Sequence, residues 1–286
     1  MTAENYRITL ASGMRELSLS PYSVCRVLTE GLSGFDFPQI DVEYSSTSGE
    51  GGALLRRRID ARILRIAFEV ADAAQNVSIG DTVRAIMNPH ADITVRTYLN
   101  GRHRSIRAVP YRAAEFSEPS FGDPLKITLT LICPEPYFTD GVSRRISFPV
   151  TTPILSFPLN LMSGAGTVCS FAASAVMGNV RNIGDAECGV HISVTAARGS
   201  IREPSMSCGG RYVKYTGTLA AGDRLSICTL PGSCALQLNG ITTYSFDRAS
   251  RFFTLSPGDN FLRLIAADGG GNADISVEYT PLYLGA

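Results

Sequence analysis

Short runs of alternating apolar and polar residues fill most of the chain and predict β-strands. In LKITLTLIC (residues 125–133) the odd-numbered positions are leucine, isoleucine or cysteine, whereas Lys126, Thr128 and Thr130 lie between them. A period of two places the apolar set on one face of a half-buried strand. The same pattern predicts further strands in the first half at Tyr6–Leu10, Ile40–Tyr44, Leu64–Val70, Ile93–Leu99 and Ser105–Tyr111.

One hairpin and one helix stand out among these strands. The dipeptide Asn-Gly at 100–101 separates two alternating runs and favours a tight β-turn, because both residues tolerate positive φ. The segment Ser78–Met87 has apolar residues at helical spacing, a serine cap followed by Asp81, and a stop at Asn88. We therefore expect one helix in a largely β first half.

The second half opens with a proline-punctuated apolar segment, ISFPVTTPILSFPLNLM (146–162), which is typical of a linker lying across a surface. Short strands with almost no helical pattern follow, with turns at Asn239-Gly240 and at Gly269–Asn272. This spacing predicts an antiparallel β-sandwich. Its strands are expected at Cys188–Thr195, Arg211–Thr216, Arg224–Thr229, Ala235–Leu238, Phe252–Leu255, Phe261–Ala266 and Asp274–Tyr279.

Together the patterns predict a mainly β protein of two domains. Residues 1–148 are expected to form an N-terminal β-barrel-like domain with one helix and a long hairpin. Residues 149–166 are expected to be a linker, and residues 167–286 the C-terminal sandwich. The stretch 146–180 carries no charge and is too apolar to lie fully in water, so part of it should cover the first domain or a neighbour.

Charge adds no preference for nucleic acid or membrane. The 26 basic residues balance the 26 acidic ones, so neither a basic nucleic-acid module nor an acidic tail is present. Prolines and glycines interrupt the uncharged stretch before it reaches the length of a membrane-spanning helix, so we expect no membrane insertion. The start MTAENYRITL lacks the basic and apolar regions of a secretory signal.

The cysteines are expected to be reduced and mostly buried. There are 7, an odd number, and with 3 scattered histidines they show no zinc-binding spacing, so we expect no metal and no cofactor. Cys133, in ICPEPYF, could be a nucleophile, but no histidine is near it in sequence to act as a base. Pro134 cannot pair in a ladder, so we interpret the motif as a strand end that Tyr137 and Phe138 anchor.

An arginine-rich run follows a glycine-rich loop in GEGGALLRRRIDARILR (49–65). The loop lacks the lysine and the helix of a phosphate-binding loop. Asp60 and the alternating apolar residues favour a solvated or interface strand face, with nucleic-acid binding as the weaker alternative. The interface candidates are Arg56, Arg57, Arg58 and Arg62 of this run, Tyr137 and Phe138 of the cysteine motif, and Phe157 and Leu159 of the linker.

No catalytic motif is recognisable, and we expect no enzyme. Nucleophile-elbow, zinc-protease, calcium-loop and dinucleotide patterns are all missing. Paired carboxylates stay open, because such pairs meet only in three dimensions. Asp185 and Glu187 share one loop and His191 lies in a strand, positions more typical of solvated or face residues than of a catalytic pair.

Taken in order, several stretches resemble the distal tail protein family of long non-contractile phage tails. In the first half these are GEGGALLRRRIDARILRIAFEV, the helix ending at Asn88-Pro89, the hairpin at 100–101 and ICPEPYF, a turn that closes the N-terminal domain in that family. In the second half they are NIGDAECGVHISV, IREPSMSC, LAAGDRLSICT, FFTLSPGDNFLRLIA and ISVEYTPLYLG. Each is weak alone, and their order along essentially the whole chain is the specific part.

The resemblance implies a virion protein without catalytic residues. Family members form a hexameric ring at the tip of the tail tube, between the tube protein and the tail-associated hub. The N-terminal domain builds the ring and a channel through which DNA only passes. The C-terminal domain is a galectin-like sandwich that can hold receptor-binding or baseplate proteins. Assembly would take place in the host cytoplasm.

Two alternatives remain at this point. One is a carbohydrate-binding module that touches the host surface, although the chain has no tryptophan for a sugar platform. The less favoured one is a cell-wall hydrolase.

Overall fold

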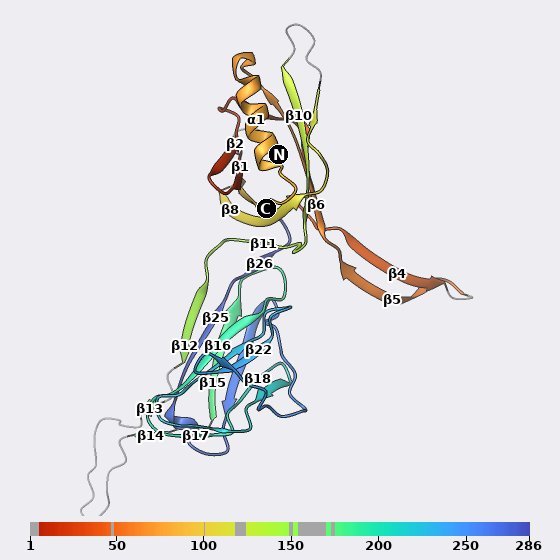
Figure 1. The fold of residues 1–286 in the computed structure, drawn as a ribbon. Coiled ribbons are helices and arrows are strands. Elements are labelled where there is room, and N and C mark those ends of the chain that lie inside the picture. Colours follow the sequence, from red (N-terminus) through yellow and green to blue (C-terminus); the bar gives the residue numbers. More distant parts are fainter. Residues whose placement is uncertain are drawn as a thin grey trace, which may run out of the picture. The chain divides into compact units, whose positions relative to one another are not determined.

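The computed structural model describes residues 6–46, 49–99, 101–117, 124–148, 151–153, 170–172 and 175–286. These residues are mainly in antiparallel strands, with one α-helix among them, which confirms the expected fold class (Figure 1). The chain divides into two compact units. Unit 1 consists of Met1–Gly141 and Leu282–Ala286, and unit 2 of Val142–Pro281. No helix of the described ranges is long and apolar enough to cross a membrane.

Unit 1 is built on one barrel-like run of antiparallel strands in the order β2-β1-β7-β8-β10-β6-β3. β8 pairs with β7 from Arg102 to Ala108 and with β10 only at its last two residues, so it joins the two halves of the run. The strands are β1 (Tyr6–Ser12), β2 (Arg15–Leu19), β3 (Cys25–Ser33), β6 (Arg62–Val70), β7 (Ile93–Leu99), β8 (Arg102–Pro110), β9 (Glu115–Phe116), β10 (Leu125–Cys133), β11 (Phe138–Thr139) and β26 (Leu282–Tyr283).

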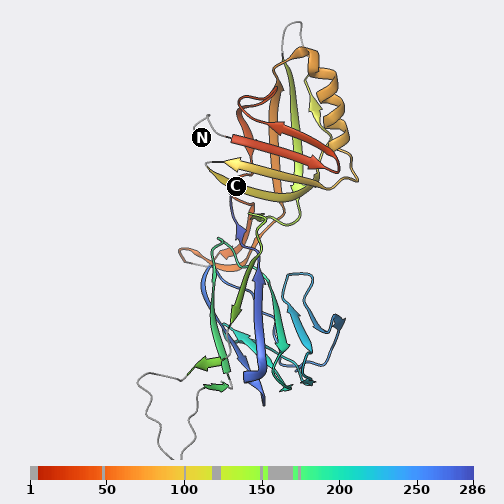
Figure 2. The same ribbon diagram turned by 90° about the vertical axis from the view of Figure 1, so that its left-hand side faces the viewer.

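The apolar faces of these strands enclose the core of unit 1. Period two holds along β6 and β10, whose inward positions are almost fully buried, as with Leu64, Ile66 and Phe68. The helix α1 (Asn76–Ile86) packs against β1 and β2 and adds Val83 and Ile86 to this core (Figure 2). The hairpin expected at 100–101 joins β7 to β8, and its Asn100 lies outside the described residues.

The helix begins two residues before the expected serine cap. A 3₁₀ turn, η1 (Ala73–Gln75), leads into it, and the Asp72 carboxylate accepts a hydrogen bond from the Ala74 N–H at 3.0 Å. The chain has therefore already turned before Ser78, whose carbonyl accepts a bond from the Thr82 hydroxyl inside the helix. An aspartate cap and short turn upstream took the role that the sequence assigned to the serine.

Two further strands, β4 (Ile40–Ser46) and β5 (Gly52–Ile59), pair only with each other. They form a hairpin that extends away from the rest of unit 1 (Figure 1). We call this hairpin the arm.

The end of the chain returns to unit 1. β26 pairs with β11 through Phe138 opposite Tyr283, and the Ala286 N–H donates to the Phe35 carbonyl at 3.0 Å. Unit 2 is therefore inserted between two strands, β11 and β26, that are neighbours in unit 1. The sequence division at residue 148 did not include this return, because a two-residue strand has no periodicity to detect.

Unit 2 is an antiparallel β-sandwich, as expected. One sheet has the order β12-β25-β16-β21-β22-β23 and the other the order β15-β24-β18-β19. The strands of these sheets are β12 (Arg144–Phe148), β15 (Ala175–Asn182), β16 (Val190–Ala196), β18 (Ser205–Cys208), β19 (Arg211–Lys214), β21 (Arg224–Cys228), β22 (Ala235–Leu238), β23 (Ile241–Thr242), β24 (Gly258–Ile265) and β25 (Ala273–Tyr279). Small pairs are formed by β13 (Thr151–Pro153) with β14 (Ser170–Ala172) and by β17 (Ile201–Arg202) with β20 (Thr218–Leu219).

The unit boundary differs from the expected one. Residues 144–148 form β12, which pairs along β25 in unit 2 rather than closing the first domain. Gly178 has no side chain, and a Cβ there would come within 1.9 Å of the Phe148 ring, so the sandwich has room for Phe148 only beside a glycine. Of the expected linker 149–166, only the strand β13 lies within the described residues.

Two expected elements of unit 2 take another form. Phe252–Leu255 is not a strand, and only an isolated bridge joins Leu255 to Cys188. The glycines expected to form a loose hairpin instead form a 3₁₀ turn, η2 (Gly270–Asn272), which Gly269 enters at a φ of 71°. A positive φ at Gly269 lets the chain turn directly into β25.

Candidate assembly surface

The arm has one apolar face. Residues directly opposite each other in an antiparallel ladder point to the same side. Ile40 is opposite Ile59, Val42 is opposite Arg57, and Tyr44 is opposite Leu54. The large apolar side chains of this face are exposed, by 57% for Ile40, 48% for Val42, 71% for Tyr44 and 60% for Leu54.

The other face of the arm is charged, and its charges pair within the hairpin. The Asp41 carboxylate lies 3.5 Å from the Arg56 guanidinium and 3.3 Å from Nε of Arg58. Nε of Arg58 also lies 2.7 Å from the Asp60 carboxylate. Exposed pairs of this kind add little stability, but they neutralise the face. The arm is thus amphipathic, with paired charges on one side and, on the other, exposed apolar groups together with Arg57.

The interface residues predicted from the sequence fall into three places. Arg56, Arg57 and Arg58 lie on β5 of the arm, where they are exposed. Arg62 is 1% exposed and Phe138 is fully buried, so neither offers a surface to another chain, and Tyr137 beside them is half-buried. Phe157 and Leu159 lie outside the described residues. The apolar residues of the arm were not among the candidates.

Arg62 holds three separate segments together inside unit 1. Its guanidinium donates to the carbonyls of Gly34 at 2.6 Å, Pro136 at 2.7 Å and Leu284 at 2.5 Å. It also lies 4.8 Å from the centroid of the Phe138 ring. The turn after β10, the loop after β3 and the returning C-terminus therefore all depend on one buried cation.

The cysteine motif is a strand end without thiol chemistry. β10 ends at Cys133, as expected, and the side chain is fully buried. Burial raises the pKa of the Cys133 thiol to about 12, and the nearby Arg62 offsets this only in part. A thiol with such a pKa stays protonated near neutral pH and is a poor nucleophile. Cys25 and Cys188 are also buried, and burial raises each thiol pKa to about 11.

Among the described residues, no metal-binding or acidic cluster forms a second candidate site. No three histidine, cysteine, aspartate or glutamate side chains of the described residues come together as a metal site. In unit 2, the Glu187 carboxylate accepts a bond from the Thr254 hydroxyl at 2.7 Å, and His191 is exposed on β16. The most distinctive surface for function is therefore the arm.

The comparisons with known proteins point to phage tails. Residues 183–283 match the family model of the siphovirus-type tail component, C-terminal domain. No curated protein matches the chain.

A solved structure shares the fold over nearly the whole chain. The Dit protein of phage SPP1, described as a paradigm of the hub adsorption apparatus in phages that infect Gram-positive bacteria, has a TM-score of 0.67 and 15% identity. The match covers 97% of this chain and 99% of that one. A chain of the phage P2 baseplate in its activated conformation matches at a TM-score of 0.41 and 8% identity, over 97% of this chain and 98% of that one, too weakly to carry an argument.

The resemblance to phage distal tail proteins is thus confirmed. Residues 183–283 match the family model, and the structural match shows a common fold with SPP1 Dit.

Proposed function

We propose that this protein is a structural component of a phage tail tip that self-associates, through its arm, into a closed hexameric ring. The ring would join the tail tube to the tail-associated hub and to baseplate or receptor-binding proteins. The observation that carries self-association is the amphipathic arm. The resemblance to distal tail proteins supports the hexamer and the place in the virion.

The arm needs a partner on physical grounds. A two-stranded hairpin is marginally stable by itself in water. Fully burying one large apolar side chain contributes about 1.5–3 kcal/mol, and the arm leaves Ile40, Val42, Tyr44 and Leu54 exposed together. Clustered exposed apolar groups of this kind mark a surface for another chain. The charged face needs no partner, because its ion pairs are internal.

A ring follows if the partner is a second copy. The arm of one subunit would lie on a different surface of the next, so the two sides of the contact would not be identical. Head-to-tail contacts of this kind form a ring when the rotation between subunits closes. In this arrangement DNA only passes through the channel, and the protein carries no catalytic residue. It would be assembled in the host cytoplasm and remain in the virion.

Point variants on the arm test this proposal. We expect the double variant Val42→Ser, Tyr44→Ser to lose self-association while the rest of the chain stays folded, because the arm lies outside the core of unit 1. Sedimentation of the full chain measures the assembly, and circular dichroism measures the fold. The control is Val77→Ser, which removes an exposed apolar group from α1. Equal assembly of the double variant and the control would contradict a role for the apolar face.

A further inference from the structure

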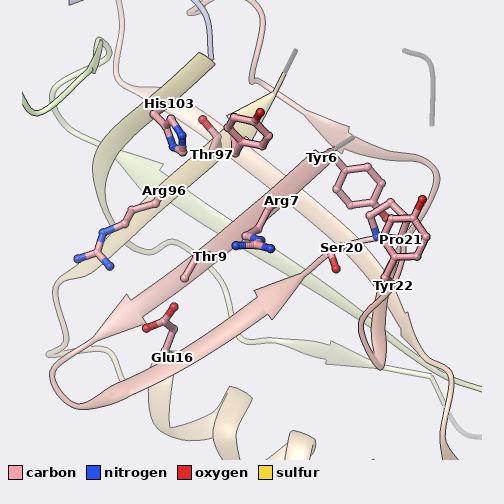
Figure 3. A pocket seen from close by; sticks show the side chains of 11 residues that line it. Tyr6, Arg7, Thr9, Glu16, Ser20, Pro21, Tyr22, Arg96, Thr97 and His103 are labelled. Atoms are coloured by element: carbon pink, nitrogen blue, oxygen red, sulfur yellow. The ribbon is translucent and has the colours of Figure 1, made fainter. Parts of the chain in front are cut away.

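A hollow on unit 1, away from the arm, is lined by two arginines, Arg7 and Arg96. It measures about 510 Å³ and lies over β1, β2 and β7, on the side opposite the core (Figure 3). Arg7 and Thr9 project from β1 to the same side, and Arg96 of β7 is directly opposite Thr9 in the ladder. Neither arginine makes an ion pair or a side-chain hydrogen bond with any residue of the described ranges.

The Thr9 hydroxyl, which lies between these arginines, is also available to bond a ligand. Thr9 is only 7% exposed, although it lies on the polar face of the sheet, and its hydroxyl bonds to no described residue. Thr97, which also lines the hollow, differs, because its hydroxyl bonds to the Arg104 carbonyl at 3.3 Å. Arg7 and Arg96 are diagonal neighbours across the two strands, a spacing of about 7–8 Å that long side chains can bridge.

Aromatic rings border the same hollow. Tyr98 is opposite Arg7 in the ladder, and its ring centroid lies 4.6 Å from that of His103. Tyr6 is held by a hydrogen bond from the Val27 N–H to its hydroxyl at 3.0 Å. Tyr22, which also lines the hollow, is highly exposed. The Tyr98 ring, which packs against His103 on the face of Arg7 and Arg96, provides a stacking surface beside the cations.

We propose that this hollow binds the phosphate monoester of a ring compound. Two guanidinium groups and one hydroxyl can donate to the three terminal oxygens of a phosphate, whereas a carboxylate has only two oxygens. The hollow is of the size that holds small organic ligands, so the tyrosines have room to contact a ring attached to the phosphate. The ring can be a nucleoside or a sugar, and the shared chemistry is the phosphoryl group.

Glu16 provides a further test of phosphate binding. It lines the hollow near Thr9, and its carboxylate has no ion pair within the described ranges (Figure 3). A carboxylate there repels a phosphate. Glu16→Gln should therefore tighten binding, which a purely structural role of the hollow does not predict.

Calorimetric titration of the full chain with adenosine monophosphate and with glucose phosphate tests the site. We expect at least one to bind, and Arg7→Gln and Arg96→Gln each to weaken it by about tenfold or more, since each removes a charge-assisted bond. The control is Arg107→Gln on the same face, opposite Thr94 and outside the hollow, which should bind normally. Adenosine and glucose without phosphate should not bind.

Each result of the titrations has a distinct meaning. Binding of adenosine monophosphate alone identifies a nucleotide, binding of glucose phosphate alone a phosphosugar, and binding of both a site that accepts either ring. Failure of both to bind overturns the proposal. So does equal binding of the phosphate-free compounds, or binding that Arg7→Gln and Arg96→Gln leave unchanged.

Discussion

Replacing Arg62 with methionine is expected to destabilise unit 1 by about 3 kcal/mol or more, since it removes three hydrogen bonds from one charged donor, and a bond to a charged group contributes about 1.5–3 kcal/mol. The variant removes the donor of three carbonyls, those of Gly34, Pro136 and Leu284, in a side chain that is 1% exposed. Domains have a total stability of about 5–15 kcal/mol, so a loss of this size brings unit 1 close to unfolding.

Denaturant unfolding followed by circular dichroism measures this loss. The matched control is Arg65→Met on the same strand, whose side chain points to the outer face and is exposed. Surface substitutions of this kind usually change stability by less than about 0.5 kcal/mol. If the two variants lost similar stability, Arg62 would not be the residue that joins the three segments.

Removing the last five residues, Leu282–Ala286, should have an effect of similar size on unit 1 and little effect on unit 2. The truncation deletes β26, which pairs with β11, and the ring of Tyr283, which is 7% exposed and 3.6 Å from the Arg104 guanidinium. It also removes the Leu284 carbonyl that Arg62 binds. Truncating a buried aromatic alone costs about 3–5 kcal/mol.

Calorimetry of the full and truncated chains distinguishes the two units. Each unit has its own buried core, so two transitions are expected in the full chain. The truncation should lower one of them and leave the other in place. A chain that melted unchanged without its last five residues would show that β26 does not support unit 1.

Much of the fold could be predicted, because a strand with one buried face shows alternating apolar and polar residues in its sequence. β7, β10 and β22 begin and end at the expected residues. The same alternation would also have predicted that Arg62 is buried, because it lies on the same face of β6 as Leu64, Ile66 and Phe68. Its place among exposed arginines led to the interface interpretation, because a charged side chain is almost never fully buried unless it is paired.

The apolar face of the arm could not be predicted from the sequence pattern. The strand at Ile40–Tyr44 was predicted, but the apolar face depends on how β5 pairs with it. The register shifts between Glu43 and Tyr44, so Leu54 is opposite Tyr44 and Leu55 is left over. A bulge of this kind breaks the alternation that reveals a strand face. Only the ladder shows which apolar residues of the arm lie together.

Native mass spectrometry of the full chain and of an armless variant tests self-association through the arm most directly. In the variant, Asp41–Arg58 is replaced by Asn-Gly, which can join Ile40 to Ile59 because these residues are already opposite each other. The account predicts a hexamer for the full chain and a folded monomer for the variant. The same assembly with and without the arm would contradict it.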